Sequence, residues 1–163
     1  EFTLELLPVL ESAAPSQVIF VTSMMHKFGK LNFNSFEGWK KYSGGGAYNQ
    51  SKLAIMLLAR ELAERVEDRK IAVNTLHPGA VNTGILDGYS KTVQFFLRKL
   101  FISVEKGAKT SLFLACQESK SLPTGRYFVN CKEASAHKLL ANTVMREKLW
   151  DQCCEYLNRT SAP

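Results

Sequence analysis

The chain contains a tyrosine and a lysine whose spacing could support proton transfer. Tyr48 and Lys52 are four residues apart, which places two side chains on one face of a helix, one turn apart. A free tyrosine loses its proton only near pH ~10, and a neighbouring ammonium group stabilises the phenolate form. The pair therefore predicts a tyrosine that acts as an acid-base catalyst, with the lysine as its activating charge.

The surrounding elements are more specific than this spacing, which also arises by chance in chains of this composition. Residues 18–21 form an apolar run typical of a parallel strand covered on both faces, and Thr22-Ser23 follows directly. A strong helical pattern runs from Ala47 to about Glu67. Ligands of open α/β sheets bind in the crevice at the carboxyl ends of the strands, so we expect Ser23 and Tyr48 at that rim.

Further hydrophobic patterns predict alternating helices and strands. Helices are expected over residues 2–11, 104–116 and about 140–157, strands over residues 70–76 and 126–130, and a functional loop over residues 24–46. About three strands, all parallel, are too few to close a sheet without leaving a long unpaired edge. The sequence thus indicates the α/β class and a single partial domain over residues 1–163.

The helix over residues 47–67 has a wide apolar surface. One stripe is formed by Ile55, Leu58, Leu62 and Val66, and it is widened by Leu53, Met56 and Leu57. Two buried faces imply a second packing partner. Apolar area of that kind favours association, either as a homodimer through this helix or with another protein.

Composition narrows the classes of partner. The formal net charge of +6 suggests an anionic ligand, but the basic residues are scattered, so nucleic-acid binding is not expected. A phosphate-bearing cofactor or an anionic membrane surface would account for the same charge. No stretch approaches the ~20 apolar residues of a membrane-spanning helix. The four cysteines lack metal-ligand spacing, which predicts no metal site and reduced, mostly buried thiols.

Three other motifs are weaker. Gly44-Gly45-Gly46 lacks the phosphate-loop pattern and is expected to be flexible backbone before the helix. A hydrolase triad of Ser23 with His26 or His77 is not favoured, because there is no G-x-S-x-G elbow. Two functions stay open for the basic and apolar residues from Thr92 to Val104: contact with a membrane surface, or a flap that closes over an apolar substrate.

Three longer motifs occur in the order known from one enzyme family: Val21-Thr22-Ser23, Tyr48-Asn49-Gln50-Ser51-Lys52, and the segment from Asn74 to Thr83. The chain resembles the second half of a short-chain dehydrogenase/reductase, and residues 125–132 and 149–150 resemble its retinol dehydrogenase-like branch. The resemblance implies the C-terminal half of a doubly wound, Rossmann-type parallel sheet flanked by helices. The glycine-rich first turn of that fold would lie upstream, since this sequence does not contain it.

The resemblance also implies residue roles. Tyr48 would exchange a proton with the substrate oxygen, Ser23 would hold that oxygen, and Lys52 would activate Tyr48 and bind the nicotinamide ribose. The nicotinamide end would contact Pro78, Gly79, Val81 and Thr83. The implied cofactor is NADP, with NAD as the alternative. The implied substrate is a small alcohol or carbonyl compound, apolar and either retinoid-like or another lipid.

Two functions of different classes follow. In the first, the chain is part of an NAD(P)-dependent alcohol/carbonyl oxidoreductase of the cytoplasm or the cytoplasmic face of the endoplasmic reticulum. It would be inactive alone, because most of the cofactor-binding surface is missing. In the second, it is a truncated, non-enzymatic isoform that binds an intact partner through the helix over residues 47–67.

Overall fold

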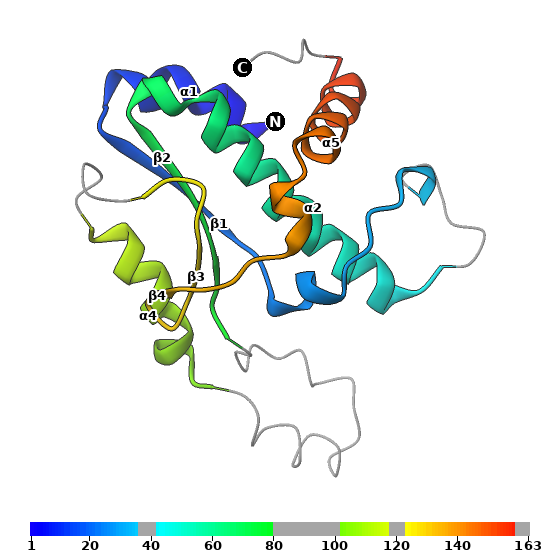
Figure 1. Cartoon of the computed structure of the whole chain (residues 1–163). Coiled ribbons are helices and arrows are strands. Elements are labelled where there is room, and N and C mark those ends of the chain that lie inside the picture. Colours follow the sequence, from blue (N-terminus) through cyan, green and yellow to red (C-terminus); the bar gives the residue numbers. More distant parts are fainter. Residues whose placement is uncertain (36–41, 80–101, 118–122, 159–163) are drawn as a thin grey trace.

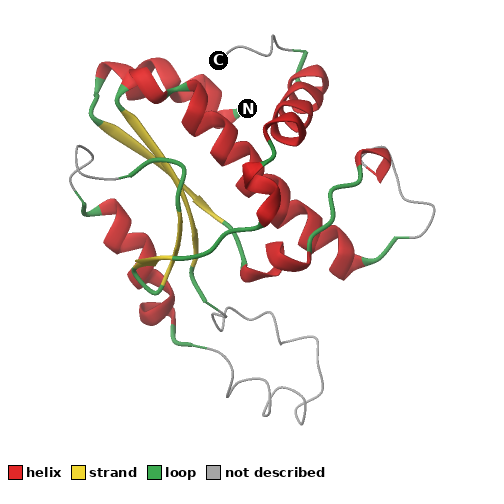
Figure 2. Cartoon of the chain, viewed as in Figure 1, coloured by secondary structure: helices red, strands yellow, loops and turns green. Residues whose placement is uncertain are grey.

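A computed structural model of the chain describes residues 1–35, 42–79, 102–117 and 123–158. Its main elements are α1 (Phe2–Ser12), β1 (Ser16–Val21), α2 (Gly44–Arg65), β2 (Ile71–His77), α4 (Val104–Ala115), β3 (Tyr127–Val129), β4 (Lys132–Glu133) and α5 (Thr143–Tyr156). Four 3-10 helices lie between them: η1 (Met24–Phe28), η2 (Phe33–Ser35), η3 (Glu67–Arg69) and η4 (Lys138–Ala141). Helices and strands alternate over most of the chain, so the α/β class is confirmed (Figure 2).

The strands form one sheet in the order β1-β2-β3-β4. The first three are parallel, with Ser16 opposite Ile71 and Thr75 opposite Tyr127. β4 is antiparallel to β3, so the expectation that all strands are parallel is wrong at this edge. The two residues between β3 and β4 both have positive φ, as a type I′ hairpin turn requires. The second of them is Cys131 in place of the usual glycine, so the sequence carried no strong hairpin signal.

Helices cover both faces of this sheet (Figure 1). On one face, Leu7 of α1 and Leu62 of α2 share a cluster with Ile71 and Val73 of β2. On the other face, Leu114 of α4 packs with Leu76 of β2 and with Phe128. All seven residues of β2 are consequently buried, as predicted for an apolar parallel strand.

The strand β1 is equally apolar but lies at the edge of the sheet. Its first five residues are only partly buried, and the side chain of Val21 is 50% exposed. Within the described residues only β2 pairs with β1, so the predicted unpaired edge is confirmed and lies along β1.

The second packing partner expected for α2 is α5. Leu53 and Leu57 of α2 form a buried cluster with Leu149 of α5, whereas Leu62 on another part of α2 faces the sheet. The apolar surface of α2 through which a non-enzymatic isoform would bind a partner is therefore covered within the chain. The structure gives that alternative no support.

Three local expectations differ from the structure. α2 begins at Gly44, three residues earlier than predicted. α5 begins at Thr143 and not near Leu140 as predicted, because Leu140 belongs to the separate 3-10 helix η4. The cysteines are free, but only Cys154 is buried, so the expectation of mostly buried thiols is wrong. Cys116 is exposed at the C-cap of α4. In the part of the chain that the structure describes, no helix has the length and apolar character that crossing a bilayer demands.

Candidate active site

The first turns of α2 carry the predicted acid-base pair. The helix begins where the Ser43 hydroxyl accepts a hydrogen bond from the Gly46 amide at 3.4 Å, which satisfies one of the free amides of the first turn. Tyr48 is 47% exposed. The ammonium nitrogen of Lys52 lies 5.6 Å from the centroid of the Tyr48 ring. The structure therefore brings the two side chains together at an open end of the helix.

Ser23 lies two residues after β1 and caps η1. Its hydroxyl oxygen accepts a hydrogen bond from the Met25 amide at 3.3 Å, and the side chain is nearly buried. A hydroxyl that accepts one bond still has a hydrogen to donate. Among the described residues that hydrogen has no acceptor, so it can serve an oxygen atom brought by a ligand.

Thr22 ties the end of β1 to α2. Its buried hydroxyl donates to the backbone carbonyl of Lys52 at 2.9 Å, and its amide donates to the carbonyl of Leu76 at 2.8 Å. One residue thus links β1 to β2 and to α2 immediately before Ser23. This role was not predicted from the sequence, because a threonine after an apolar strand is too common to signal a cross-link.

Gly29 allows η1 to pack directly on α2. A Cβ atom at this position would lie 2.7 Å from the carbonyl oxygen of Asn49 and 2.8 Å from the Cβ of Leu53. Both atoms belong to the helix turns that contain Tyr48 and Lys52. The loop that follows Ser23 can therefore approach the acid-base pair only with glycine at position 29.

His26 holds the backbone of Ser23 and not its hydroxyl. Its Nδ1 lies 2.7 Å from the Ser23 carbonyl oxygen, and burial is the main reason that the pKa of His26 is lowered. A neutral ring that donates through Nδ1 to a carbonyl cannot also take the Ser23 proton through that atom. This geometry agrees with the absence of a hydrolase triad in the sequence.

Tyr127 is the other tyrosine near this loop, since its ring meets the His26 ring edge-on with centroids 4.9 Å apart. Burial raises the pKa of Tyr127 to about 12, which keeps its phenol protonated at neutral pH. It is also fully enclosed, whereas Tyr48 is open to solvent. Tyr127 is therefore the weaker candidate for proton exchange with a ligand.

The predicted cofactor loop begins directly after β2. Pro78 and Gly79 are half-buried there, and Gly79 has a φ of +97°, which favours glycine. A Cβ atom on Gly79 would lie 2.4 Å from the Cδ1 of Ile102. Val81, Thr83 and residues 92–101 of the predicted membrane or flap segment lie outside the described residues.

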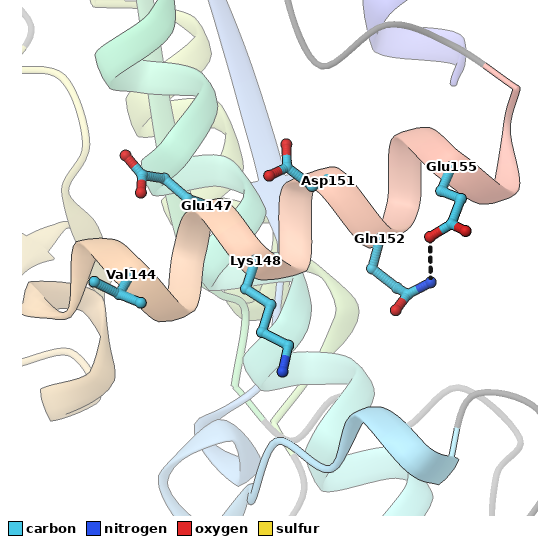
Figure 3. Close-up of a pocket in the computed structure, with 6 residues that line it drawn as sticks. All are labelled: Val144, Glu147, Lys148, Asp151, Gln152 and Glu155. Carbon is cyan, nitrogen blue, oxygen red and sulfur yellow. Dashed lines mark hydrogen bonds between the residues drawn. The ribbon is translucent and has the colours of Figure 1, made fainter.

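A surface hollow on α5 has a different character (Figure 3). It is lined by Val144, Glu147, Lys148, Asp151, Gln152 and Glu155. Figure 3 shows the lysine pointing away from Glu147 and Asp151, and Gln152 donates to Glu155 at 3.1 Å. Three carboxylates against one ammonium disfavour an anionic cofactor, so this hollow does not compete with the rim at Ser23 and Tyr48.

A family model described as short chain dehydrogenase matches residues 1–94, which include β1, the first turns of α2 and the loop after β2. The chain belongs to this family. The match contains Ser23, Tyr48, Lys52, Pro78 and Gly79, together with Thr22 and Gly29.

Retinol dehydrogenases are among the similar proteins of this family. Retinol dehydrogenase 14 of Mus musculus is 37% identical over 154 residues, and the match covers 90% of this chain and 46% of the relative. Retinol dehydrogenase 12 of Homo sapiens is 35% identical, with 93% of this chain and 49% of the relative covered. The chain thus spans about half the length of the relatives it matches.

Solved structures support the same fold. An uncharacterized protein from Mycobacterium paratuberculosis matches with a TM-score of 0.68 and 22% identity, covering 91% of this chain and 52% of that one. The NADPH-bound carbonyl reductase from chicken fatty liver matches with a TM-score of 0.57 and 20% identity, covering 82% and 50%. At these identities the likeness concerns the fold alone.

Proposed function

We propose that the complete protein containing this chain is an oxidoreductase that transfers hydride between a nicotinamide cofactor and an alcohol or carbonyl group. The observation that carries the proposal is the Lys52 ammonium 5.6 Å from the Tyr48 ring centroid, on the helix that Thr22 ties to the strand end at Ser23. Membership of the short chain dehydrogenase family supports the same reaction class.

The residues present suit the nicotinamide end of such a cofactor. Lys52 offers an ammonium with three donors, which matches the paired hydroxyls of a ribose. Gly79 has a conformation that favours glycine and lies at the carboxyl end of β2, where open α/β sheets bind ligands. Pro78, Val81 and Thr83 complete the proposed contacts. When bound, the nicotinamide would supply or accept the hydride.

Proton movement would use this chain's own side chains. In reduction, Tyr48 donates its hydroxyl proton to the substrate oxygen; in oxidation, the Tyr48 phenolate takes the proton back. Ser23 donates its free hydroxyl hydrogen to the same oxygen, which orients the carbonyl and stabilises the negative charge that develops on it. Lys52 holds its ammonium beside the Tyr48 ring, 5.6 Å from the ring centroid, where it can also reach the ribose of a bound cofactor.

For the substrate we propose an apolar alcohol or carbonyl compound of the retinoid or lipid type, in keeping with the names of the retinol dehydrogenase relatives. For the cofactor we propose NADP, with NAD as the alternative; the chicken carbonyl reductase of similar fold was solved with NADPH. We further propose that the protein acts in the cytoplasm or at the cytoplasmic face of the endoplasmic reticulum.

The substitution Tyr48→Phe in the complete protein tests this assignment. Removing the exchangeable proton is expected to lower kcat by about 10²–10⁴-fold, the usual contribution of a general acid-base catalyst. Turnover is followed by nicotinamide absorbance, with NADPH or NADH and a panel of apolar aldehydes that includes retinaldehyde.

Tyr156→Phe is the matched control, since Tyr156 is 50% exposed and Tyr48 is 47% exposed. Tyr156 lies at the end of α5 and not on α2, so the kcat of the Tyr156→Phe variant is expected to stay near that of the native protein. Near-native turnover by Tyr48→Phe would remove Tyr48 from the reaction and overturn the proposed function.

A further inference from the structure

Thr22 contributes a hydrogen bond that the proposed reaction does not use. The side chain is 3% exposed, and its hydroxyl donates to the carbonyl of Lys52, thirty positions later in the chain. That carbonyl lies inside α2, where it can also accept its own helical hydrogen bond, because a carbonyl oxygen has two lone pairs. The bond is therefore additional to what the helix requires.

The position of Thr22 is itself restrained from the other side. Its amide donates to the Leu76 carbonyl at 2.8 Å, which continues the pairing of β1 with β2 past Val21. Neither the strand end nor the helix turn can shift alone without breaking one of these two bonds. Ser23 is the next residue along the chain, so the bonds of Thr22 also restrain the position of its backbone.

The bond acts where the end of β1 meets α2, a boundary that the contact of Gly29 with α2 and the hydrogen bonds of Gln50 to the following loop also hold. β1 is a partly exposed edge strand within the described residues, and the helix end that carries Tyr48 is open to solvent. Thr22 joins these two elements through a buried contact, at the residue next to Ser23 on one side and at Lys52 on the other.

We propose that Thr22 is a positioning residue that sets the spacing between Ser23, just after β1, and the Tyr48–Lys52 pair on α2. The inference rests on the proposed function, because the spacing matters only if these three side chains act on one substrate. Thr22 touches neither substrate nor cofactor in this proposal; it acts through the backbone of Lys52 and of Ser23.

The test is a set of three substitutions in the complete protein, each assayed for kcat, KM and thermal unfolding. Thr22→Val keeps the shape but removes the donor, and kcat is expected to fall about 10–100-fold, as a small misplacement of reacting groups does. The KM of the aldehyde should change less than about threefold, because binding groups are untouched. Thr22→Ser restores the hydroxyl and should recover most of kcat.

Thr75→Val is the matched control. Thr75 is also a buried strand threonine, on β2, and its hydroxyl donates to the Arg126 carbonyl at 3.2 Å and makes no hydrogen bond to α2. It should show a loss of unfolding temperature similar to that of Thr22→Val, with kcat near the native value. An equal loss of kcat in both variants would mean that any buried threonine bond matters, and would overturn the inference.

The outcomes separate this inference from the proposed function. If Tyr48→Phe abolishes turnover while Thr22→Val keeps the native kcat, only the positioning role fails. If Tyr48→Phe turns over normally, the proposed function fails, whatever Thr22→Val does. Should Thr22→Val not fold, Thr22→Ala takes its place with the same expected loss; if neither folds, the hydroxyl is required for folding and the positioning role is overturned.

Discussion

The two ends of α2 have opposite environments. At the N-terminal end Tyr48 and Ser51 are exposed, and the neighbouring loop is held by the hydrogen bonds of Thr22 and Gln50 and by the close contact at Gly29. At the C-terminal end Glu61, Leu62 and Ala63 are buried against the sheet and α5. One helix thus has a firmly packed end that anchors it and an open end that presents its reactive side chains.

The packed end contains a buried ion cluster. Arg146 of α5 donates through Nε to Glu61 at 3.3 Å and through its other nitrogens to Glu64 and to the Leu140 carbonyl. Glu61 also accepts from Arg65 at 2.9 Å. Burial of a charge is costly unless it is paired and hydrogen-bonded, and here Glu61 and Glu64 pair with three arginines, since Arg60 also donates to Glu64 at 2.9 Å. The cluster therefore fixes how α5 lies on α2.

Breaking this cluster should have the largest effect on stability. Arg146→Met removes the buried one of the two arginines that pair with Glu61 and leaves its Oε2 without that partner, so it is expected to lower the free energy of unfolding by about 3–5 kcal/mol. The change is measured by urea unfolding of the protein. Among molecules that remain folded, kcat should change little, because the cluster lies at the far end of α2 from Tyr48.

The matched control is Arg126→Met, which removes a salt bridge of the same type at the surface. Arg126 and Glu133 are 52% and 51% exposed, whereas Arg146 and Glu61 are 3% and 6% exposed. An exposed pair contributes about 0–1 kcal/mol. Equal losses in the two variants would show that burial does not distinguish the packed end of α2.

A smaller effect is expected at the open end from Gly29→Ala. The added Cβ would meet the Asn49 carbonyl at 2.7 Å, so η1 must move away from α2, at a cost of about 1–3 kcal/mol. The kcat should also fall, because η1 begins directly after Ser23 and its movement would displace the Ser23 hydroxyl. Unfolding and turnover are measured on the same preparation.

Gly45→Ala should change the free energy of unfolding in the opposite direction from Gly29→Ala. No atom lies within 4 Å of a Cβ at position 45 in the first turn of α2, so alanine should stabilise the helix by up to about 1 kcal/mol. Destabilisation by Gly45→Ala, or stabilisation by Gly29→Ala, would contradict the expectation that a side chain at position 29, but not at position 45, meets closely packed atoms.

The smallest effect concerns pH. Burial is the first cause of the lowered pKa of His26, so the folded protein binds its proton less readily than the unfolded chain does. Stability from His26 is therefore complete above its unfolded pKa of about 6.5 and is lost as pH falls through the lower folded value, by at most about 1.4 kcal/mol per pH unit. His77 and His137 shift in the same direction, and burial is the first cause for each.

The comparison of native protein with His26→Gln isolates this contribution. Glutamine cannot titrate, so the decrease in the free energy of unfolding between about pH 7 and pH 5 should be smaller in the variant. An unchanged or steeper decrease would show that His26 is not held neutral beside Ser23.

Much of the fold followed from local pattern. The apolar runs predicted β1 and β2 because each strand, once buried, needs apolar side chains on both faces. Helical spacing predicted α2 and α4 closely. β4 was missed because it has two residues and an atypical turn, and the start of α5 was misplaced because Leu140 continues the apolar pattern into η4.

For the site, the four-residue spacing of Tyr48 and Lys52 was enough to predict that their side chains lie together, since any helix brings such residues onto one face. The supporting contacts could not be found in the same way. Thr22 reaches Lys52 across 30 positions and Arg146 reaches Glu61 across 85. Threonines, arginines and glutamates are common at many positions, and only the packing of α2 on the strand end and on α5 decided which of them meet.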